Sequence, residues 1–543
     1  MSASHKKQLR KEQNAAQMTE KQQAAQKEAK KLRLYTVLFA AAIVLMIGIV
    51  IFSTVSSSGI IERGTTAVTV GDSKISAVEL NYYYFDAINE YVEQWGDYIS
   101  LTGLDTTAPL NEQEVSEGTT WADYFLDYAT ENIHSVYAVY NEAKAAGYTL
   151  CEEDAASIDS SIATMEMYAL YYYGYSDLDS FLVAMYGNGS NEETYRAYAE
   201  VQYVASAFAN DHMDSLTYSD DDIAAVLAEE PKAYNTYAYN YYYLSTSSFL
   251  EGGTTDEDGN VTYSDEEKAA SVEACKAAAN SLLEQNIDSV VLFDKAISNL
   301  EINTDTTASS TAVTDKLYTG LSATLKDWVS ADERTVGELG CIPYETESTD
   351  AEGNTTTTVN GYYVVLFLGS DDNQYLMNNV RHILVSFTGG TTDDDGNTVY
   401  SDEEKAAALA EAEEILAEYE AGEMTEDAFA ALANEYSDDT GSNTTGGLYE
   451  NIVPSSSYVE NFLNWVIDDA RTPGETGIVE TEYGYHIMYF VGDSELTYRD
   501  YMIISALRTE DMTEWQDALV EASAMTVKNT KNVKLDLVLS SGT

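Results

Sequence analysis

A long internal repeat is the feature of this sequence that most constrains its fold. The stretch GGTTDEDGNVTYSDEEKAA at residues 252–270 recurs as GGTTDDDGNTVYSDEEKAA at residues 389–407, 137 positions later. Six downstream residues return at the same offset: Trp328, Arg334, Thr335, Gly337, Glu338 and Gly340 match Trp465, Arg471, Thr472, Gly474, Glu475 and Gly477. Similarity at a fixed offset indicates duplicated structural units. We therefore expect two copies of one domain, over residues 233–371 and 372–496.

The local pattern of each copy indicates a compact α+β domain. In the second copy an Asp-Gly pair, Asp395 and Gly396, is typical of a β-hairpin turn. A helix then begins at a capping box formed by Ser401 and Glu404. A second helix, a polar loop, a short helix and a closing strand over 485–491 follow, and the first copy repeats this order. This succession of strands and helices predicts a mixed α+β fold.

The N-terminal end has the character of a membrane anchor. Residues 1–33 carry nine Lys and Arg against three acidic residues, and residues 34–55 are uncharged. A run of about 20 mostly apolar residues crosses a hydrocarbon core of about 30 Å, whereas a cleaved signal peptide has an apolar stretch of only about 7–15 residues. Because basic flanks stay in the cytoplasm, we expect a cytoplasmic head (1–33), a single transmembrane helix (34–55), a linker (56–64) and an extracytoplasmic bulk at the cell membrane.

The charge and the cysteine content exclude several functions. The chain has 92 Asp and Glu but 28 Lys and Arg, a formal net charge of −64, and such a surface repels nucleic acid. Cys151, Cys275 and Cys341 are widely separated and form no CxxC pair, so neither a disulfide framework nor a cysteine zinc site is expected. Because 45% of the residues are apolar, the chain can bury sizeable cores, which excludes disorder of the whole chain.

Three stretches of the second copy resemble the parvulin family of peptidyl-prolyl isomerases. They are RHILVSF (381–387), SDDTGSNTTGGLYEN (437–451) and RTPGETGIVETEYGYHIMYF (471–490). A similarity to membrane-attached foldases of the PrsA/SurA type extends the resemblance to most of the chain after the anchor. It implies a helical chaperone-like domain over 65–232, completed by the C-terminal segment 497–543, and two tandem parvulin-like α+β domains.

The resemblance also implies the residues of an active site. His382 and His486 are expected back to back on adjacent central strands, with ring nitrogens that hydrogen-bond each other. Asp439 is expected beside the substrate carbonyl, where its carboxylate acts through charge and hydrogen bonding and not as a nucleophile. Thr481 and Tyr483 correspond to polar positions around the histidines.

The same resemblance places Leu448, Tyr458 and Phe462 around the proline ring of a substrate. The sequence departs from the family here, because Ser456, Ser457 and Tyr458 stand where Gly-Gln-Met is usual. Rotation about a prolyl amide needs no covalent step; the catalyst holds the ring, takes the amide out of water and favours the twisted state. No metal and no cofactor are therefore expected.

The first copy lacks these residues and resembles a degenerate parvulin domain. Tyr363 stands at the position of His486, and the position of His382 is expected within Leu244–Ser245. No histidine lies between His212 and His382. We therefore expect this copy to bind or to act as a spacer, and not to catalyse.

The helical region before the repeats is unusually rich in tyrosine, with runs at 82–84 and 171–173. Tyrosine offers a large apolar area with a polar tip, which suits a surface that binds many unfolded sequences. Ordinary packing between helices is the alternative interpretation of the same pattern.

Together these features predict a peptidyl-prolyl cis-trans isomerase and chaperone that assists the folding of secreted proteins outside the membrane. Its expected partners are unfolded or newly secreted polypeptides with X-Pro bonds, and the membrane through the N-terminal helix; the sequence leaves open whether the chain forms a homodimer. The alternative is a non-catalytic holdase or assembly scaffold with a vestigial isomerase domain.

Overall fold

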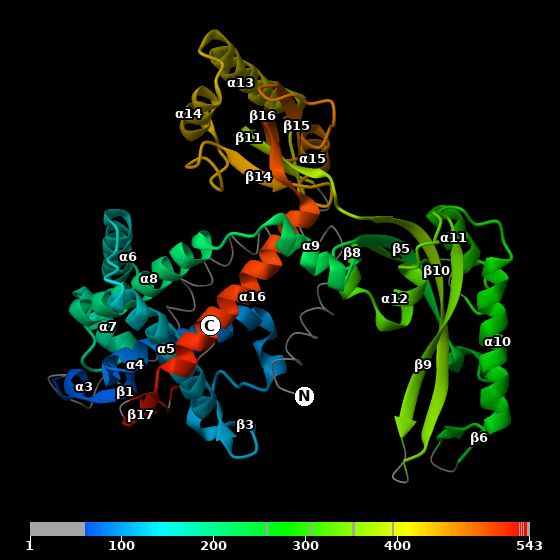
Figure 1. The fold of residues 1–543 in the computed structure, drawn as a ribbon, viewed down its shortest axis with the longest axis horizontal. Helices are drawn as coiled ribbons and strands as arrows, with labels where there is room; N and C mark the ends of the chain where they lie inside the picture. Colours follow the sequence, from blue (N-terminus) through cyan, green and yellow to red (C-terminus); the bar gives the residue numbers. More distant parts are fainter. Residues whose placement is uncertain are drawn as a thin grey trace. The chain divides into compact units, whose positions relative to one another are not determined.

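The computed structural model describes residues 60–531 except 257–258, 304–306, 350–352 and 394–395, together with residues 533, 535 and 537–539. The expected cytoplasmic head, the transmembrane helix and most of the linker lie outside the described residues. Within the described part, no helix combines the length and the apolar character needed to cross a membrane. The chain divides into two compact units (Figure 1): the described residues up to Thr217 together with those from Leu507 onward, and Tyr218–Ala506.

The first unit is mainly helical. Its long helices begin at side-chain caps; for example, the Ser76 hydroxyl accepts a hydrogen bond from the Glu79 amide over 3.1 Å. Its elements are α3 (Ile60–Gly64), β1 (Thr66–Val70), β2 (Ser73–Ser76), α4 (Ala77–Trp95), η2 (Gly96–Thr102), η3 (Leu110–Glu112), β3 (Glu114–Ser116), β4 (Thr119–Thr120), α5 (Trp121–Ala145), α6 (Glu152–Tyr171), α7 (Leu178–Tyr186), α8 (Glu192–Ser215) and β17 (Met525–Val527).

Two segments that are far apart in the sequence, residues 66–70 and 525–527, pair in the small sheet of this unit. The strand order is β17-β1-β2, and β17 pairs antiparallel with β1 so that Val527 lies opposite Val68. The Lys528 amide then donates to the Ala67 carbonyl over 2.7 Å. The C-terminal segment therefore supplies a strand that the N-terminal residues of the unit lack.

The two tyrosine runs of this unit have different environments. Tyr82, Tyr83 and Tyr84 lie on α4 and are fully buried in the core. Tyr171 and Tyr172, at the end of α6, are 81% and 72% exposed. The first run therefore packs the interior, whereas Tyr171 and Tyr172 provide aromatic surface and Tyr173 packs against the core.

The second unit begins with α9 (Asp220–Glu229) and contains both copies of the repeat. The elements of the first copy are β5 (Thr236–Ser245), η4 (Thr246–Phe249), β6 (Thr254–Thr255), β7 (Val261–Thr262), α10 (Asp265–Leu283), α11 (Val290–Ser298), β8 (Thr311–Leu317), η5 (Tyr318–Gly320), α12 (Ala323–Val329), β9 (Leu339–Thr349) and β10 (Thr355–Asp371). Its antiparallel sheet has the order β8-β5-β10-β9.

The second copy repeats this topology. Its elements are β11 (Leu376–Ser386), β12 (Thr391–Thr392), β13 (Thr398–Val399), α13 (Asp402–Ala421), α14 (Glu426–Tyr436), β14 (Leu448–Ile452), α15 (Glu460–Val466), β15 (Thr476–Glu480) and β16 (Gly484–Thr497); the helix α16 (Tyr498–Ala522) follows. The sheet order β14-β11-β16-β15 is that of the first copy, element for element. The repeat in the sequence is thus a repeat of the fold, and the expected mixed α+β class is confirmed.

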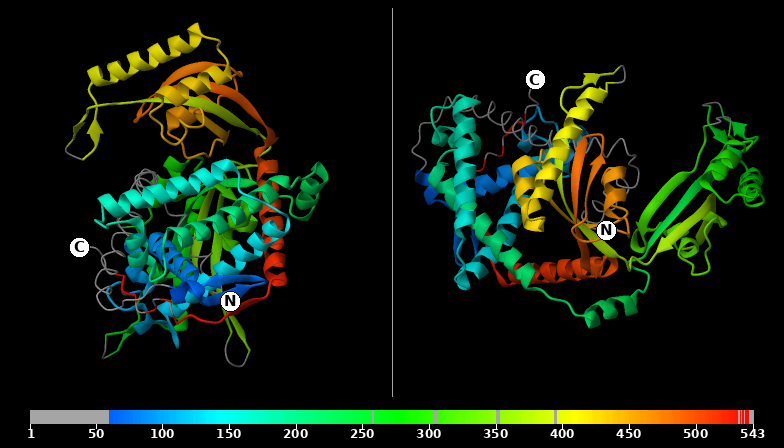
Figure 2. Two further views of the ribbon diagram at one scale, coloured as in Figure 1. Left: turned by 90° about the vertical axis from the view of Figure 1, so that its left-hand side faces the viewer. Right: turned by 90° about the horizontal axis from the view of Figure 1, so that it is seen from above.

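Helices cover both faces of the second sheet. On one face, α13 and α14 pack against Ile383, Val385 and Ile487 (Figure 2). On the other face, α15 packs against Val380 and Met488. Since successive residues of a strand point to opposite faces, His382 and His486 share the face of α15.

The repeated Trp, Arg and Gly residues form the same corner in both copies. The Arg471 guanidinium lies 3.9 Å above the Trp465 ring, and Arg334 lies 4.6 Å above Trp328. A Cβ atom on Gly477 would stand 2.8 Å from the Trp465 indole nitrogen, so only glycine leaves room for the ring. The matching residues at an offset of 137 therefore reflect packing and not a second active site.

Candidate active site

The two central strands bring the two histidines together. His382 lies on β11 opposite Met488, and His486 lies on β16 opposite Leu384, so the imidazoles are diagonal neighbours on one face. Their Nδ1 atoms are 3.0 Å apart, and the ring centroids are 5.1 Å apart. The side chains are almost wholly buried, with 2% and 6% exposure.

The loop after α14 is fixed to the edge of β11. The Ser437 hydroxyl accepts from the Leu384 amide, the Asp438 amide donates to the Leu384 carbonyl, and a carboxylate oxygen of Asp438 accepts from the Ser386 amide. Farther along, Gly447 has φ +71°, and its close approach to the His382 carbonyl leaves no space for a Cβ atom. These contacts position Asp439 beside His382.

One carboxylate oxygen of Asp439 accepts three side-chain hydrogen bonds. His382 Nε2 lies 2.9 Å from Oδ2, the Ser442 hydroxyl 2.6 Å and the Tyr449 hydroxyl 2.9 Å. The hydrogen bond from His382 is the main cause that holds the pKa of Asp439 well below its usual range, and it outweighs the opposing effect of burial. Asp439 is therefore a carboxylate at neutral pH.

The ionised Asp439 fixes the direction of its hydrogen bond with His382. A carboxylate only accepts, so His382 carries a hydrogen on Nε2. Behind it, the Nδ1 atoms of His382 and His486 are hydrogen-bonded to each other, and His486 Nε2 lies 2.9 Å from the Thr481 hydroxyl, which also donates to the Gly484 carbonyl over 3.3 Å. The Tyr483 amide donates to the same hydroxyl over 3.2 Å. A continuous series of hydrogen bonds thus runs from the turn between β15 and β16 to Asp439.

Aromatic rings enclose the histidine pair. Phe462 stands edge-on to His382 and His486, with centroids 5.4 and 5.3 Å away. Tyr449 stacks on His382 at 5.1 Å, and Tyr458 lies 5.3 Å from Phe462. Phe462 is almost wholly buried, whereas Tyr449 and Tyr458 are half-buried. The polar chain is therefore bordered by a half-exposed aromatic wall, which has the properties needed to hold an apolar ring.

The structure brings together seven of the eight residues predicted for the site. Tyr483 takes part through its main-chain amide, while its side chain is 41% exposed. The exception is Leu448. Leu448 pairs with Arg381 and Tyr449 with Val380, so the pleat turns Leu448 away from the face that holds Phe462.

Sequence reasoning missed Tyr449 and Ser442. Tyr449 occupies the place in the aromatic wall that was expected for Leu448, one residue away along β14. The register of the structure identifies it, because Tyr449 pairs with Val380, whose side chain lies on the face of α15. Ser442 had no comparable signal, because its contact with Asp439 depends on the tight turn between them.

The register of the first copy identifies the equivalents of the histidines. Gly361 of β10 corresponds to Gly484 of β16. Tyr363 and His486 each lie two residues after that glycine, so Tyr363 takes the place of His486. Val365 pairs with Tyr241 as Met488 pairs with His382. Tyr241 is therefore the equivalent of His382, and the expected position within Leu244–Ser245 is wrong.

Two tyrosines stand where the second copy has its histidine pair. The rings of Tyr241 and Tyr363 are 5.6 Å apart in an edge-to-face arrangement, and Tyr243 lies 4.8 Å from Tyr363. The described residues of this copy contain no His, so the series of hydrogen bonds of the second copy has no counterpart there. The first copy keeps the fold and carries an aromatic cluster at the position of the site.

Comparison with known families gives a match over residues 363–492, to the model described as the PPIC-type PPIASE domain. Among solved structures, PrsA from Bacillus anthracis is 22% identical (TM-score 0.17), with 28% of this chain and 59% of that chain covered. The PPIase domain of TbPar42 is 25% identical (TM-score 0.16; 21% and 98% covered). A SurA-like chaperone structure from Campylobacter jejuni is 20% identical (TM-score 0.15; 28% and 56% covered).

The chain spans little more than half the length of the PrsA structure, and a search of curated proteins found no match. The family match covers nearly all of the second copy, including both histidines, Asp439 and the aromatic wall. Residues 363–492 of this chain therefore match the PPIC-type peptidyl-prolyl isomerase domain, which is the parvulin type.

Proposed function

We propose that the second copy is an active peptidyl-prolyl isomerase and that the whole chain is a foldase for polypeptides outside the membrane. The observation that carries the proposal is the chain of hydrogen bonds from Thr481 through the two histidines to Asp439, bordered by Tyr449, Tyr458 and Phe462. The family match supports the reaction class.

In this proposal the aromatic wall holds the proline ring, and Asp439 faces the X-Pro amide. Rotation about the C–N bond has a barrier of about 18–20 kcal/mol because it destroys amide resonance. Removing the amide from water and stabilising its twisted state lowers that barrier, and about 5 kcal/mol corresponds to nearly four decades in rate. His382, His486 and Thr481 act as positioning residues that hold Asp439 ionised and aligned.

The activity is tested with the full chain and a denatured protein whose refolding is limited by prolyl isomerisation. The uncatalysed step takes tens to hundreds of seconds, so catalytic amounts of the chain should shorten the slow refolding phase several-fold. An unchanged slow phase, together with unchanged kinetics of X-Pro peptides, would exclude the isomerase.

The proposed location is the outer side of the cell membrane, with residues 34–55 as the anchor. The basic head and the uncharged segment of the sequence support this orientation. Protease added to intact protoplasts should degrade the acidic bulk and leave the head protected. Protection of the bulk would contradict the proposed location.

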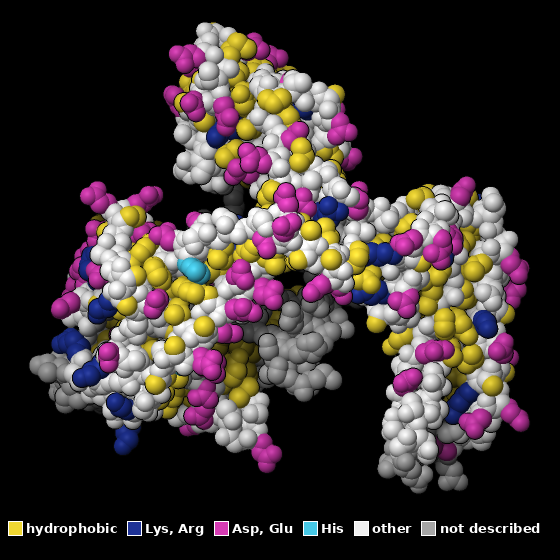
Figure 3. Space-filling view, in the orientation of Figure 1, with side chains coloured by type: hydrophobic (Ala, Val, Ile, Leu, Met, Phe, Trp, Pro, Cys, Tyr) yellow, Lys and Arg dark blue, Asp and Glu magenta, His cyan; other side chains and the backbone are white. Residues whose placement is uncertain are grey.

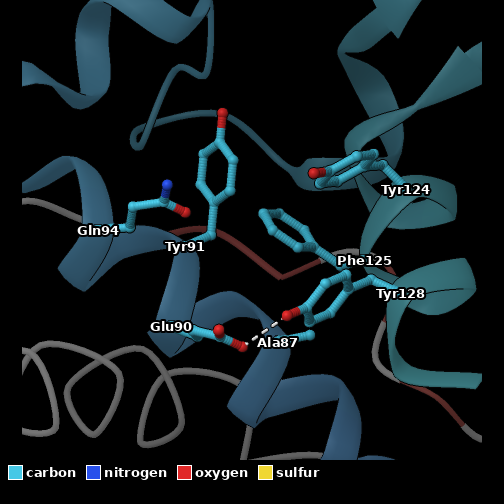
Figure 4. Close-up of a pocket in the computed structure, with 7 residues that line it drawn as sticks. All are labelled: Ala87, Glu90, Tyr91, Gln94, Tyr124, Phe125 and Tyr128. Atoms are coloured by element: carbon cyan, nitrogen blue, oxygen red, sulfur yellow. Dashed lines mark hydrogen bonds between the residues drawn. The ribbon is translucent and has the colours of Figure 1, made fainter. Parts of the chain in front are cut away.

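A second candidate, the holdase, is favoured by the aromatic surface of the first unit. Besides Tyr171 and Tyr172, the side chains of Met167 and Leu170 on α6 are 43% and 37% exposed. A small pocket between α4 and α5 also has a wall of rings, with a hydrogen bond at its edge from the Tyr128 hydroxyl to Glu90 over 2.8 Å (Figure 4). Its lining comprises Ala87, Glu90, Tyr91, Gln94, Tyr124, Phe125 and Tyr128.

The two candidates separate in an aggregation assay with a client that contains no proline. A holdase suppresses aggregation of such a client, and changing Tyr171→Ser together with Tyr172→Ser should weaken the suppression while isomerase activity stays the same. If the client aggregates equally with and without the chain, the holdase candidate is wrong.

A further inference from the structure

The domain that holds the candidate site is extremely acidic. Residues 372–496 contain 27 Asp and Glu but only three Lys and Arg. On the face drawn in Figure 3, acidic side chains far outnumber basic ones over the domain that bears α13. Each of the three cations is held in an ion pair: Arg381 with Glu426, Lys405 with Glu480 and Arg471 with Glu475. Every Lys and Arg side chain of this domain is therefore already paired with a carboxylate of the domain.

Carboxylates also lie on the elements that carry the site residues. Three exposed acidic residues lie outside the strands and within two positions of a site residue along the chain, and none of them makes an ion pair with a described residue; they are Asp438, Glu460 and Glu482. Asp438 adjoins Asp439, Glu460 lies on α15 two residues before Phe462, and Glu482 lies between Thr481 and Tyr483. These carboxylates are thus on the loop after α14, at the start of α15 and on the turn before β16.

The centre of the site has the same sign. Asp439 is ionised, and 22% of its side chain is exposed, so its charge reaches a bound ligand. The faces of Tyr449 and Tyr458 are electron-rich and attract cations. An apolar ring beside a cationic side chain is therefore the ligand chemistry that fits this surface.

We propose that the site selects X-Pro segments in which the residue before proline, or its immediate neighbour, is Lys or Arg, and that it discriminates against acidic or phosphorylated residues there. This inference rests on the proposed isomerase function. A surface of one sign steers oppositely charged ligands and raises their association rate by one to three decades at low salt. The Debye length falls from about 30 Å at 0.01 M salt to about 3 Å at 1 M, so the selectivity must weaken as salt is added.

The test uses the full chain and three peptides that differ only in the residue before proline: Lys, Leu and Glu. At low salt we expect kcat/KM to decrease in the order Lys, Leu, Glu, with about tenfold or more between the first and the last. In 1 M salt the ratio should shrink to within about twofold to threefold. The Leu-Pro peptide, which carries no charge at this position, reports the isomerase activity by itself.

Matched variants separate local charge from net charge. The double change Glu460→Gln and Glu482→Gln removes two carboxylates from elements that carry site residues, and it should reduce the low-salt preference for Lys over Glu at least threefold. The control Glu413→Gln with Glu414→Gln removes the same charge from exposed positions of α13, which packs on the other face of the sheet, and it should leave the preference unchanged. Neither pair belongs to the hydrogen-bond chain.

The outcomes distinguish this inference from the proposed function. If Leu-Pro is accelerated but the three peptides differ by less than twofold at low salt, the selectivity is wrong and the isomerase stands. Equal effects of the two double variants would also overturn it, because the discrimination would then follow net charge. If no peptide is accelerated, both proposals fail.

Discussion

At the scale of single residues, the candidate site depends on Asp439. Its Oδ2 atom is the common acceptor for His382, Ser442 and Tyr449, so its charge orients every donor around it. The motifs predicted the histidines, Asp439 and Thr481, because each lies in a distinctive stretch of sequence. They placed Leu448 where Tyr449 lies, since neighbouring residues of a strand point to opposite faces and a shift of one position reverses the assignment.

The change Asp439→Asn should lower turnover. An amide in this position loses the charge that accepts three hydrogen bonds, and bonds to charged groups contribute about 1.5–3 kcal/mol each. We expect kcat/KM for a Leu-Pro peptide to fall about tenfold or more while thermal unfolding shows a folded domain. Asp438→Asn is the matched control, because its side-chain oxygen can still accept from the Ser386 amide. Full activity of Asp439→Asn would show that the shape of the aromatic wall suffices.

At the scale of elements, the register of the strands decides what each copy can do. The equivalents of His382 and His486 in the first copy are Tyr241 and Tyr363, offset by 141 and 123 positions, whereas the starts of α10 and α13, the starts of α12 and α15, and the Trp corner keep an offset of 137. Hairpins of different length and β-bulges change the offset between elements. The sequence repeat therefore indicated a repeated fold but could not give the strand register.

The helix α15 supplies Phe462, the aromatic ring that contacts both histidines. Phe462→Ala should reduce turnover more than His486→Gln, because it removes the wall beside both imidazoles, whereas Gln keeps part of the hydrogen-bond chain. A buried Phe→Ala change also costs about 3–5 kcal/mol of stability. The measurement is kcat/KM below the unfolding transition of each variant, with urea unfolding to establish that transition. A greater loss in His486→Gln would assign the histidines a more direct role.

The helix α4 should make the first unit sensitive to pH. Burial raises the pKa of Glu79 to about 7 and that of Asp86 to about 6, although each accepts a hydrogen bond, from Tyr137 and Tyr198 respectively. A carboxyl with a raised pKa in the folded state stabilises the fold at low pH, and this contribution is lost as pH rises from about 4.5 through about 7.

We therefore expect the opening free energy of α4, measured by hydrogen exchange, to fall by up to about 3 kcal/mol between pH 5 and pH 8. In Glu79→Gln the fall should be clearly smaller, while the exposed control Glu131→Gln should behave as the unchanged chain. An identical pH dependence in all three would show that Glu79 is ionised without cost in the folded state.

At the scale of the whole molecule, a strand near the C-terminal end of the described chain, β17, lies in the same sheet as β1. The resemblance to the foldases implied that the C-terminal segment completes the helical region, and in the structure β17 pairs with β1 in the first unit. Ending the chain after Ala522 leaves β1 and β2 as a two-stranded sheet, which is marginal by itself. We expect such a truncation to lower the unfolding temperature of the first unit and to leave the isomerase rate within about twofold. An unchanged unfolding temperature would mean that β17 is dispensable.

For the whole chain, we propose that the second copy catalyses and the first does not. The most direct measurement is the isomerisation rate of one X-Pro peptide with three full-length proteins: the unchanged chain, Asp439→Ala with Phe462→Ala, and Tyr241→Ala with Tyr363→Ala. We expect the first protein to accelerate isomerisation, the second to lose nearly all of that acceleration, and the third to keep a rate within about twofold of the unchanged chain. Substantial activity in the second protein, or its loss in a folded form of the third, would contradict the claim.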